Sequence, residues 1–467
     1  MTLIKNRESI LKYHNFQSIK DSLDALDFAF ENSSPERLVD KSVAIGSIIN
    51  VTDINRKLYQ FKLPKAKSIL VISVGKASER MLSGLTKKIG DRIAKSILII
   101  PKGYEIKSER MSALRKTTII YSSHPIPNFN SLLAARVVIE QLKHLDNIEL
   151  VIFLISGGSS SLIVSPIMGI TLEDKKEINK RLIACGADIN EINIVRKHLS
   201  NIKGGKILRF LNPKRKVISL ILSDVVGDDL STIGSGLTFY DNSSYADAIS
   251  VLQKYSIINE ESVSIRRVSK ALTRGISKRS LETVKSLEFA SLNSDNYIIG
   301  NNSNFCQKII TFLESVGYRT EYNGSSINMC IEDFISLAKD TFTQLENEKT
   351  AILFGGEITN VIDKSISGVG GRNQEAICRM IECINTMDNS DCCVICIGTD
   401  GIDGNSIDAG GFITNATLKY YKLKELNVKR FLESQDSNKL LKNLHSTINT
   451  GYTGTNFNDI YLFVRTK

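Results

Sequence analysis

The sequence predicts an α/β protein of two domains, the first built on a doubly wound parallel sheet. Short and almost unbroken apolar runs, typical of strands buried on both faces, alternate with helical segments. The chain has 467 residues, more than one hydrophobic core usually organises. Several apolar runs end in loops rich in glycine, serine and aspartate, and open α/β sheets bind ligands at that edge.

The strands of the first half are expected where the apolar runs fall, at Ser68–Val74, Ser96–Ile100, Thr118–Tyr121, Glu149–Ile155 and Val217–Leu222. Helical periodicity lies between them, over Ser131–Leu145, Thr171–Cys185 and Ile189–Ile202. The helix at Thr171 begins with a capping box that Asp174 completes. Gly204 and Gly205 are expected to stop the helix that ends near Lys203.

A polar, serine-rich stretch at Asp241–Ser244 marks the candidate boundary, giving domains over 1–243 and 244–467. The second half is expected to be α/β as well. Its elements are a strand at Tyr297–Ile299, helices over 303–316 and Ile331–Leu345, a strand at Ala351–Phe354, a helix from Asn373 to Ile384, a cysteine-rich strand over 392–397, shorter helices within 414–446 and a last strand at Asp459–Arg465.

Composition argues against several classes of protein. Lysine and arginine exceed aspartate and glutamate by 60 to 50, but the excess is spread along the chain rather than gathered into the basic stripe of a nucleic-acid binder. No apolar run approaches a membrane span and no signal peptide is recognised, so the expected location is the cytoplasm. Cys393 and Cys396 have the spacing of a metal or redox pair, but they lie inside an expected buried strand.

Five strand ends carry loops suited to ligands. They are Gly75–Ser78, Ser156–Ser161, Ser223–Asp229, Gly355–Glu357 and Gly398–Gly404. Glycine lets ligand atoms approach the backbone, and the Ser/Gly loop 156–161 is similar to a nest of N–H and hydroxyl groups that wraps phosphate oxygens. A tight turn with no ligand is the alternative for any one loop taken alone.

A sixth glycine-rich segment opens an expected helix. Gly368, Gly370 and Gly371 run into Arg372 and Asn373. Backbone N–H groups and the positive end of a helix dipole suit an anion there, and the arginine adds a planar fork of donors. A tight turn whose arginine faces water is the alternative.

The acidic loops suggest proton transfer or metal binding. Asp224 can accept a hydroxyl proton or hold Mg²⁺, whereas Asp228 and Asp229 are either metal ligands or caps of a turn. Asp400 and Asp403 are likewise either metal ligands or residues of Asx-turns. Neither a P-loop nor a dinucleotide-binding G-x-G-x-x-G unit is present. Anion-binding loops, a candidate base and fixed cations together indicate phosphoryl transfer by an unusual nucleotide cradle.

These loops, in this order, resemble the glycerate 2-kinases, the type II or MOFRL family. The matching segments are Ser73–Ala77, His124–Pro127, Ile155–Gly158, Val195–Ser200 with Lys203–Gly205, Ser223–Asp229, Gly355–Glu357, Gly370–Glu375, Gly398–Gly404, Thr453–Asn456 and the pair Asn458 and Asp459. The resemblance implies transfer of the γ-phosphoryl group of ATP, with Mg²⁺, to the 2-hydroxyl of D-glycerate. It also implies a Rossmann-like first domain, a MOFRL-type second domain and an active site in the cleft between them.

The resemblance also assigns roles to residues. It implies catalysis by Lys76, Asp224 and Arg372, with Asp224 taking the hydroxyl proton and the two cations neutralising the transferred phosphoryl group. Substrate- and nucleotide-binding positions are expected at Ser156, Gly157, Gly158, Ser159, Ser160, Asn193, Arg196, Lys203, Glu357, Gly370, Gly371 and Asn373. The metal is assigned to Asp228, Asp400 and Asp403.

Other functions compete with this one. One alternative is an oxidoreductase acting on hydroxypyruvate, and another is a kinase for another small hydroxy acid. A non-catalytic anion- or nucleic-acid-binding protein is the third, and it depends on the net charge of +10. The expected partners are small molecules rather than nucleic acid or membrane. The sequence leaves open whether the protein forms a homodimer.

Overall fold

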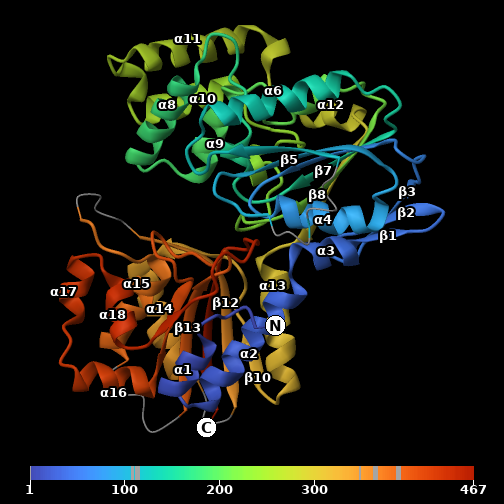
Figure 1. Ribbon diagram of the computed structural model, residues 1–467. Helices are drawn as coiled ribbons and strands as arrows, with labels where there is room; N and C mark the ends of the chain where they lie inside the picture. Colours follow the sequence, from blue (N-terminus) through green and yellow to red (C-terminus); the bar gives the residue numbers. More distant parts are fainter. Residues whose placement is uncertain are drawn as a thin grey trace. The chain divides into compact units, whose positions relative to one another are not determined.

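The computed structural model describes residues 2–106, 110, 116–345, 349–360, 366–384 and 391–466. The chain forms two compact units, coloured by sequence in Figure 1. Unit 1 comprises Met1–Ser34, Asp224–Gly227 and Gly300–Lys467, and unit 2 comprises Pro35–Ser223 and Asp228–Ile299. Each is an α/β structure with its own sheet. The fold class predicted from the sequence is therefore confirmed.

Unit 2 is built on a sheet of strand order β6-β5-β4-β7-β8-β9. The bounds are β4 Ile69–Val74, β5 Ile93–Pro101, β6 Thr117–Ser122, β7 Leu150–Ile155, β8 Lys216–Leu222 and β9 Ser294–Gly300. The pairs β4–β5, β4–β7, β5–β6 and β7–β8 are parallel. Every residue of β4 and β7 is buried, as expected for strands covered on both faces.

Helices cover both sides of this sheet. Figure 1 shows α3 (Pro35–Ser42) and α4 (Ser78–Ile89) on one side and α6 (Phe129–Lys143) on the other. A helical layer with its own apolar core packs further out and contains α8 (Leu172–Ala184), α9 (Ile189–His198), α10 (Tyr245–Lys254) and α11 (Val263–Ser277). Two shorter α-helices are α7 (Ser159–Leu162) and α12 (Ser286–Ser291). The capping box of α8 forms between Thr171 and Asp174, as predicted.

A small antiparallel sheet, β1-β2-β3, was not predicted. Its strands are β1 Val43–Ile45, β2 Ile48–Thr52 and β3 Leu58–Lys62. In β3, side chains are alternately exposed and half-buried, so the strand lacks the apolar run that marks the central sheet.

Unit 1 has a mixed sheet of order β10-β12-β16-β13-β14-β15, with β11 also paired to β12. The bounds are β10 Arg319–Tyr322, β11 Ile327–Cys330, β12 Thr350–Thr359, β13 Cys392–Gly398, β14 Gly410–Thr414, β15 Thr447–Ile448 and β16 Asp459–Arg465. β10 and β11 run parallel to β12, whereas β16 runs antiparallel to both β12 and β13. The cysteine-rich segment is the fully buried strand β13, and burial raises the pKa of the Cys393 and Cys396 thiols.

The helices of unit 1 flank its sheet. Figure 1 shows α14 (Ile331–Gln344) and α15 (Arg372–Cys383) on one side and α2 (Gln17–Asn32) and α13 (Asn302–Ser315) on the other. The shorter helices are α1 (Arg7–Tyr13), α16 (Asn415–Leu423), α17 (Val428–Glu433) and α18 (Ser437–Asn443). α14, α15 and α18 share one apolar core with β12, β13 and β16.

The compact units divide the chain at positions other than the predicted boundary between 243 and 244. The first 34 residues pack with the C-terminal half, where Phe30 meets Phe305 at 5.0 Å between ring centroids and Tyr318 Oη donates to Asp21 Oδ2 at 2.8 Å. α10 and α11 instead join the core of unit 2. The strand predicted at Tyr297–Ile299 is part of β9, the edge of the unit 2 sheet. Tertiary packing decides to which unit each segment belongs. A change of composition along the sequence does not reveal that packing.

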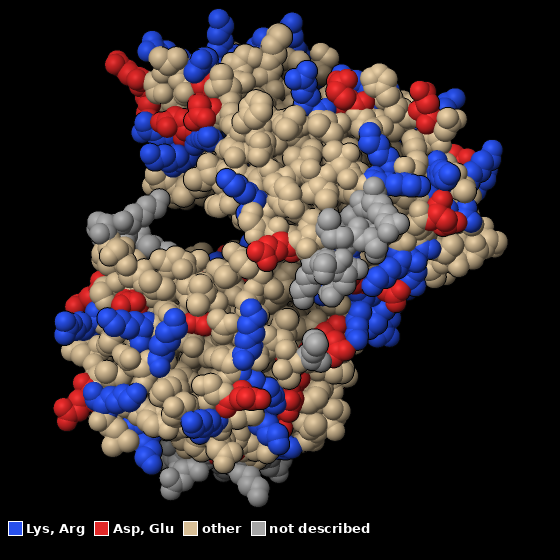
Figure 2. Space-filling view, viewed as in Figure 1, with Lys and Arg blue, Asp and Glu red and all other residues tan. Residues whose placement is uncertain are grey.

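Charged side chains are distributed over both units. On the face shown in Figure 2, basic and acidic residues are interspersed rather than separated. Among the residues that the structure describes, no helix is both long and apolar enough to cross a bilayer.

Candidate functional site

In unit 2, the loops that follow the neighbouring strands β4 and β7 interlock. Gly75 has a φ of 134°, and a Cβ there would lie 2.1 Å from Ser156 Oγ, so only glycine fits. Lys76 N–H donates to Gly157 O at 2.9 Å, and Ala77 N–H donates to Ser156 Oγ at 3.0 Å. The structure therefore brings the predicted lysine and the predicted Ser/Gly loop together at the carboxyl edge of the sheet.

The far end of the Ser/Gly loop is joined to other expected binding residues. Ser160 Oγ lies 3.0 Å from Ser235 Oγ, which donates to Asn193 Oδ1 at 3.0 Å. Lys203 Nζ donates to Gly234 O at 3.1 Å. Gly158 and Ser159 begin the short helix α7, and a Cβ on Gly158 would lie 3.5 Å from Lys76 Cγ. These residues form one hydrogen-bonded network around the loop.

Two basic side chains, Lys203 and Arg196, lie close enough together for the charge of Arg196 to affect Lys203. Burial lowers the pKa of Lys203 to about 7, and the charge of Arg196 lowers it further. Burial also lowers the pKa of Arg196, whose Nε donates to the neutral Asn179 Oδ1 at 3.0 Å. Lys203 lies beyond the end of α9, because that helix stops at His198 rather than at the predicted Ile202. These hydrogen bonds of Arg196 and Lys203 go to a neutral amide and a backbone carbonyl, so an anionic ligand would favour the charged forms of both side chains.

In unit 1, Arg372 is held between two carboxylates. Its Nε donates to Asp459 Oδ2 at 2.5 Å, its Nη2 donates to Asp459 Oδ1 at 3.3 Å, and its Nη1 donates to Glu357 Oε1. β12 supplies Glu357 and β16 supplies Asp459, which lie next to each other because Gly356 pairs with Asp459. The arginine side chain is 34% exposed, so its remaining N–H groups can still meet a ligand.

Asp224 belongs to the same cluster. Asn456 Nδ2 donates to Asp224 Oδ2 at 3.1 Å, and both residues are part of unit 1. Burial raises the pKa of Glu357; Arg372 opposes this shift, while the charges of Asp459 and Asp224 increase it. Burial alone would lower the pKa of Arg372, but Asp459 and Glu357 raise it overall. The cluster thus sets one fixed cation among three carboxylates.

Two members of this cluster, Asn456 and Asp459, were not among the predicted site residues. The signal that could have found them was available, because both lie in the 453–459 segment that resembles the family. Their spacing alone could not show that the segment lies against Arg372 and Asp224.

The glycine-rich turn before α15 differs from the prediction. Asp403, which is 2% exposed, accepts hydrogen bonds from the backbone N–H groups of Gln374 at 2.8 Å and Asn373 at 3.2 Å, and from both side-chain amides. A Cβ on Gly371 would lie 2.3 Å from Asp403 Oδ1, and one on Gly370 would lie 1.9 Å from Ser437 Oγ. The anion at this helix terminus is therefore a carboxylate of the chain itself, and the glycines serve close packing.

Of the three aspartates assigned to a metal, Asp400 and Asp403 accept hydrogen bonds from their own chain in the structure. Asp228 belongs to unit 2, whereas Asp400 and Asp403 belong to unit 1, and Asp403 caps α15. Asp400 Oδ1 accepts from Ile402 N–H at 3.1 Å, which is an Asx-turn. Asp229 caps a turn through Ser231 and Thr232. Within the described part of the chain, no three His, Cys, Asp or Glu residues form a group that could hold a metal ion.

We expect Asp403→Ala to destabilise the protein by about 2–4 kcal/mol, because it removes a helix cap and leaves buried N–H donors without an acceptor. Burial raises the pKa of Asp403 to about 7 from 3.8. The native state therefore binds more protons than the unfolded state between these pH values, so the contribution of Asp403 to stability falls as the pH rises from 4 to 7. Unfolding in denaturant at pH 5 and pH 8 measures this difference.

The matched control is Asp247→Ala, which removes the carboxylate that accepts from the Ser244 backbone N–H in the exposed capping box of α10. That variant is expected to lose about 1 kcal/mol, with little dependence on pH. If Asp403→Ala and Asp247→Ala cost the same at both pH values, the capping role given to Asp403 is wrong.

Unit 2 is doubly wound and carries a Ser/Gly loop with buried basic side chains nearby. Unit 1 fixes an arginine among carboxylates. The two features together are those of an α/β phosphotransferase. Residues 350–459 match the MOFRL family, and residues 21–270 match a domain of unknown function, DUF4147. The chain thus carries a DUF4147 domain and a MOFRL domain, and it belongs to the family of the glycerate 2-kinases that it resembles over most of its length.

Relatives and solved structures agree with this assignment. The D-glycerate 2-kinase of Thermotoga maritima is 34% identical over 411 residues, which cover 86% of this chain and 92% of that protein. The crystal structure of glycerate kinase from the same organism superimposes with a TM-score of 0.77 at 30% identity, covering 96% of this chain and 99% of that one. A relative from Agrobacterium vitis, 32% identical over 84% of this chain and 97% of its own length, is named as a candidate hydroxypyruvate reductase.

Proposed function

We propose that this protein is a glycerate 2-kinase that transfers the γ-phosphoryl group of ATP to the 2-hydroxyl of D-glycerate. The observation that carries the proposal is the cluster in unit 1, where Arg372 is fixed by Asp459 and Glu357 and lies with Asp224. A preorganised cation beside a carboxylate base is the arrangement that phosphoryl transfer to an alcohol requires.

In this proposal Asp224 accepts the proton of the 2-hydroxyl, and Asn456 orients the receiving carboxylate. The substrate oxygen forms a bond to the γ-phosphorus while the bond from that phosphorus to the β,γ-bridging oxygen breaks, which leaves 2-phosphoglycerate and ADP. The remaining N–H groups of Arg372 neutralise charge on the transferred group or hold the glycerate carboxylate. Lys76, from unit 2, acts on the same phosphoryl group as a point charge.

We assign the triphosphate to unit 2, where Ser156, Gly157, Gly158, Ser159 and Ser160 surround an anion. The buried Lys203 and the half-buried Arg196 lower the cost of placing negative charge there. Mg²⁺, when bound with the nucleotide, would offset the negative charge of its phosphates. In kinases it takes its ligands from substrate phosphates and only one or two carboxylates, for which we propose Asp228 and Asp400.

The proposed function is tested by incubating the protein with ATP, Mg²⁺ and D-glycerate and identifying the product by phosphorus NMR. We expect stoichiometric ADP and 2-phosphoglycerate, because the base and the arginine are positioned for a hydroxyl acceptor. L-Glycerate and lactate are the matched acceptor controls. Formation of 3-phosphoglycerate would overturn the assignment of the 2-position, and no ADP with any hydroxy acid would overturn the kinase.

A hydroxypyruvate reductase is the second candidate, because two of the relatives carry that name. The sequence lacks the strand–G-x-G-x-x-G–helix unit that binds a dinucleotide, which counts against it. NADH oxidation in the presence of hydroxypyruvate would support this candidate, and its absence at high enzyme concentration would close it.

A further inference from the structure

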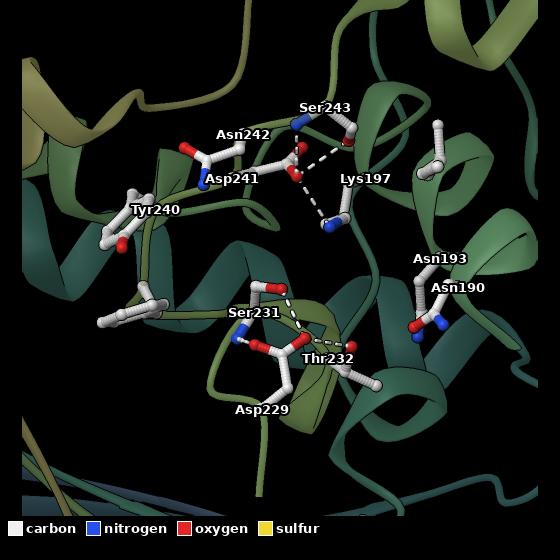
Figure 3. Close-up of a pocket in the computed structure, with 12 residues that line it drawn as sticks. Asn190, Asn193, Lys197, Asp229, Ser231, Thr232, Tyr240, Asp241, Asn242 and Ser243 are labelled. Carbon is white, nitrogen blue, oxygen red and sulfur yellow. Dashed lines mark hydrogen bonds and ion pairs between the residues drawn. The ribbon is translucent and has the colours of Figure 1, made fainter. Parts of the chain in front are cut away.

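A cavity of about 230 Å³ lies in unit 2, outside the residues to which a reaction step has been given. Figure 3 shows Lys197, Asp241 and Ser243 on one side and Asp229, Ser231 and Thr232 on the opposite side, with Tyr240 at one end and Asn190 and Asn193 at the other. The volume is below the roughly 300–1,000 Å³ of pockets for drug-sized ligands. It therefore suits one planar ring system rather than a whole nucleotide.

The charges that line the cavity do not favour an anion. The charged lining residues are one lysine, Lys197, and two aspartates, Asp229 and Asp241. Lys197 Nζ donates to Asp241 Oδ1 at 2.7 Å, so its charge is already paired. With Lys197 and Asp241 paired, the negative charge of Asp229 is the net charge of the cavity lining. Because a carboxylate accepts hydrogen bonds, the cavity favours a ligand that presents N–H donors.

At the end of the cavity where Tyr240 lies, the wall is made of packed aromatic rings. Phe239 and Tyr240 line the cavity with their ring centroids 4.4 Å apart. Phe289 supports both rings from behind, at 5.3 Å from Phe239 and 5.5 Å from Tyr240. A supported aromatic wall offers a stacking face to a heterocycle without first having to become ordered.

The amide end of the cavity leads to the loop assigned to phosphates. Asn190, Asn193 and Lys197 lie on one face of α9 at helical spacing. Asn193 Oδ1 accepts from Ser235 Oγ, so its amide nitrogen is the group that it can present to a ligand. Ser235 Oγ in turn lies 3.0 Å from Ser160 Oγ of the Ser/Gly loop. One ligand with a ring in the cavity and phosphates at the loop would span this short network.

We propose that this cavity receives the nucleobase of the phosphoryl donor, and that it selects a base carrying an exocyclic amine. The inference deepens the proposed kinase function and rests on it for the identity of the ligand as a nucleoside triphosphate. Tyr240 stacks on the base, the Asp229 carboxylate accepts from the amine, and the Asn193 amide donates to a ring nitrogen. Adenine meets these requirements, whereas hypoxanthine, with a carbonyl at the same position, does not.

The test is calorimetric binding to the whole protein without glycerate, using Mg²⁺ with ATP, ITP or inorganic tripolyphosphate. We expect ATP to bind about tenfold more tightly than ITP, and ITP to bind no better than severalfold above tripolyphosphate. Tyr240→Ala is expected to weaken ATP about tenfold and to leave tripolyphosphate unchanged. Tyr59→Ala is the matched control, since Tyr59 is a half-buried tyrosine of unit 2 that packs on Tyr297 at 4.3 Å.

The comparison of the three ligands on the unaltered protein needs no variant, so a folding defect of Tyr240→Ala, detected by its melting temperature, leaves a test in place. Equal affinities for ATP, ITP and tripolyphosphate would overturn the proposal, as would a loss of affinity in Tyr240→Ala that is the same for all three. No binding of any nucleotide would also overturn it. Failure to phosphorylate glycerate despite selective ATP binding would instead count against the proposed function alone.

Discussion

Arg372→Lys is expected to lower kcat by about 10²–10³-fold while the protein stays folded, because a lysine keeps the charge but loses the planar fork that reaches two carboxylates and a ligand. The arginine donates through Nε, Nη1 and Nη2 at once, and one ammonium group cannot reproduce that geometry. Steady-state kinetics with ATP and D-glycerate, beside a melting curve, measure both quantities.

Arg372→Ala is the less informative variant. Removing the guanidinium leaves Asp459, which is 2% exposed, beside Glu357 without a cation, and breaking such a pair typically costs about 3–5 kcal/mol. Loss of activity and loss of stability would then coincide. The matched control is Arg379→Lys, about two helical turns further along α15, where the arginine pairs with Glu375 and Glu332 near the surface. If Arg372→Lys and Arg379→Lys have the same kcat, Arg372 has no part in turnover.

Asp224→Asn is expected to reduce kcat by about 10²–10⁴-fold with little change in KM for either substrate, because an amide cannot accept the hydroxyl proton but occupies nearly the same volume. The split between kcat and KM separates a base from a binding residue. Pre-steady-state mixing, with ADP release and phosphoglycerate formation followed together, shows whether the chemical step is the one that slows.

The control for this variant is Asn456→Ala, which removes the donor to Asp224 Oδ2 but leaves the carboxylate. As a positioning residue, Asn456 should affect kcat about tenfold, well below the effect of Asp224→Asn. An unchanged rate in Asp224→Asn would assign the proton to another acceptor, and Glu357 would be examined next because its carboxylate belongs to the same cluster.

The central elements of the fold could be predicted because their signals are local. β4 and β7 are continuous apolar runs, and the capping box of α8 is a four-residue pattern. Membership of a unit is not local. α2 is amphipathic in any context, and only the contact of its Phe30 with Phe305 shows which sheet it covers. The same reason explains why β9, which the sequence predicts for the second domain, belongs to the sheet of unit 2.

The sequence predicts many of the residues of the candidate site, but it predicts few of the contacts between them. A glycine turn before a helix predicts an anion at the helix terminus, and the structure has one, but it is Asp403 rather than a ligand. The pattern describes what the N–H groups need and cannot say whether another part of the chain supplies it. Asp459 was missed for the complementary reason, because a carboxylate at the start of a strand has no local feature that points to Arg372.

The packing of the first 34 residues with the C-terminal half has a consequence for how the chain folds during synthesis. Every strand of the unit 2 sheet has been translated once residue 300 is added, so this sheet can form while the later part of the chain is still being translated. The partners of α2 emerge later: α13 begins at Asn302, and β16 ends at Arg465. The apolar face of α2 therefore lacks α13 until the second half of the chain is being translated, and it lacks β16 until translation is almost finished. The unit that contains Arg372 is thus the last to fold, and slow elongation in the second half of the message prolongs the time in which α2 can aggregate.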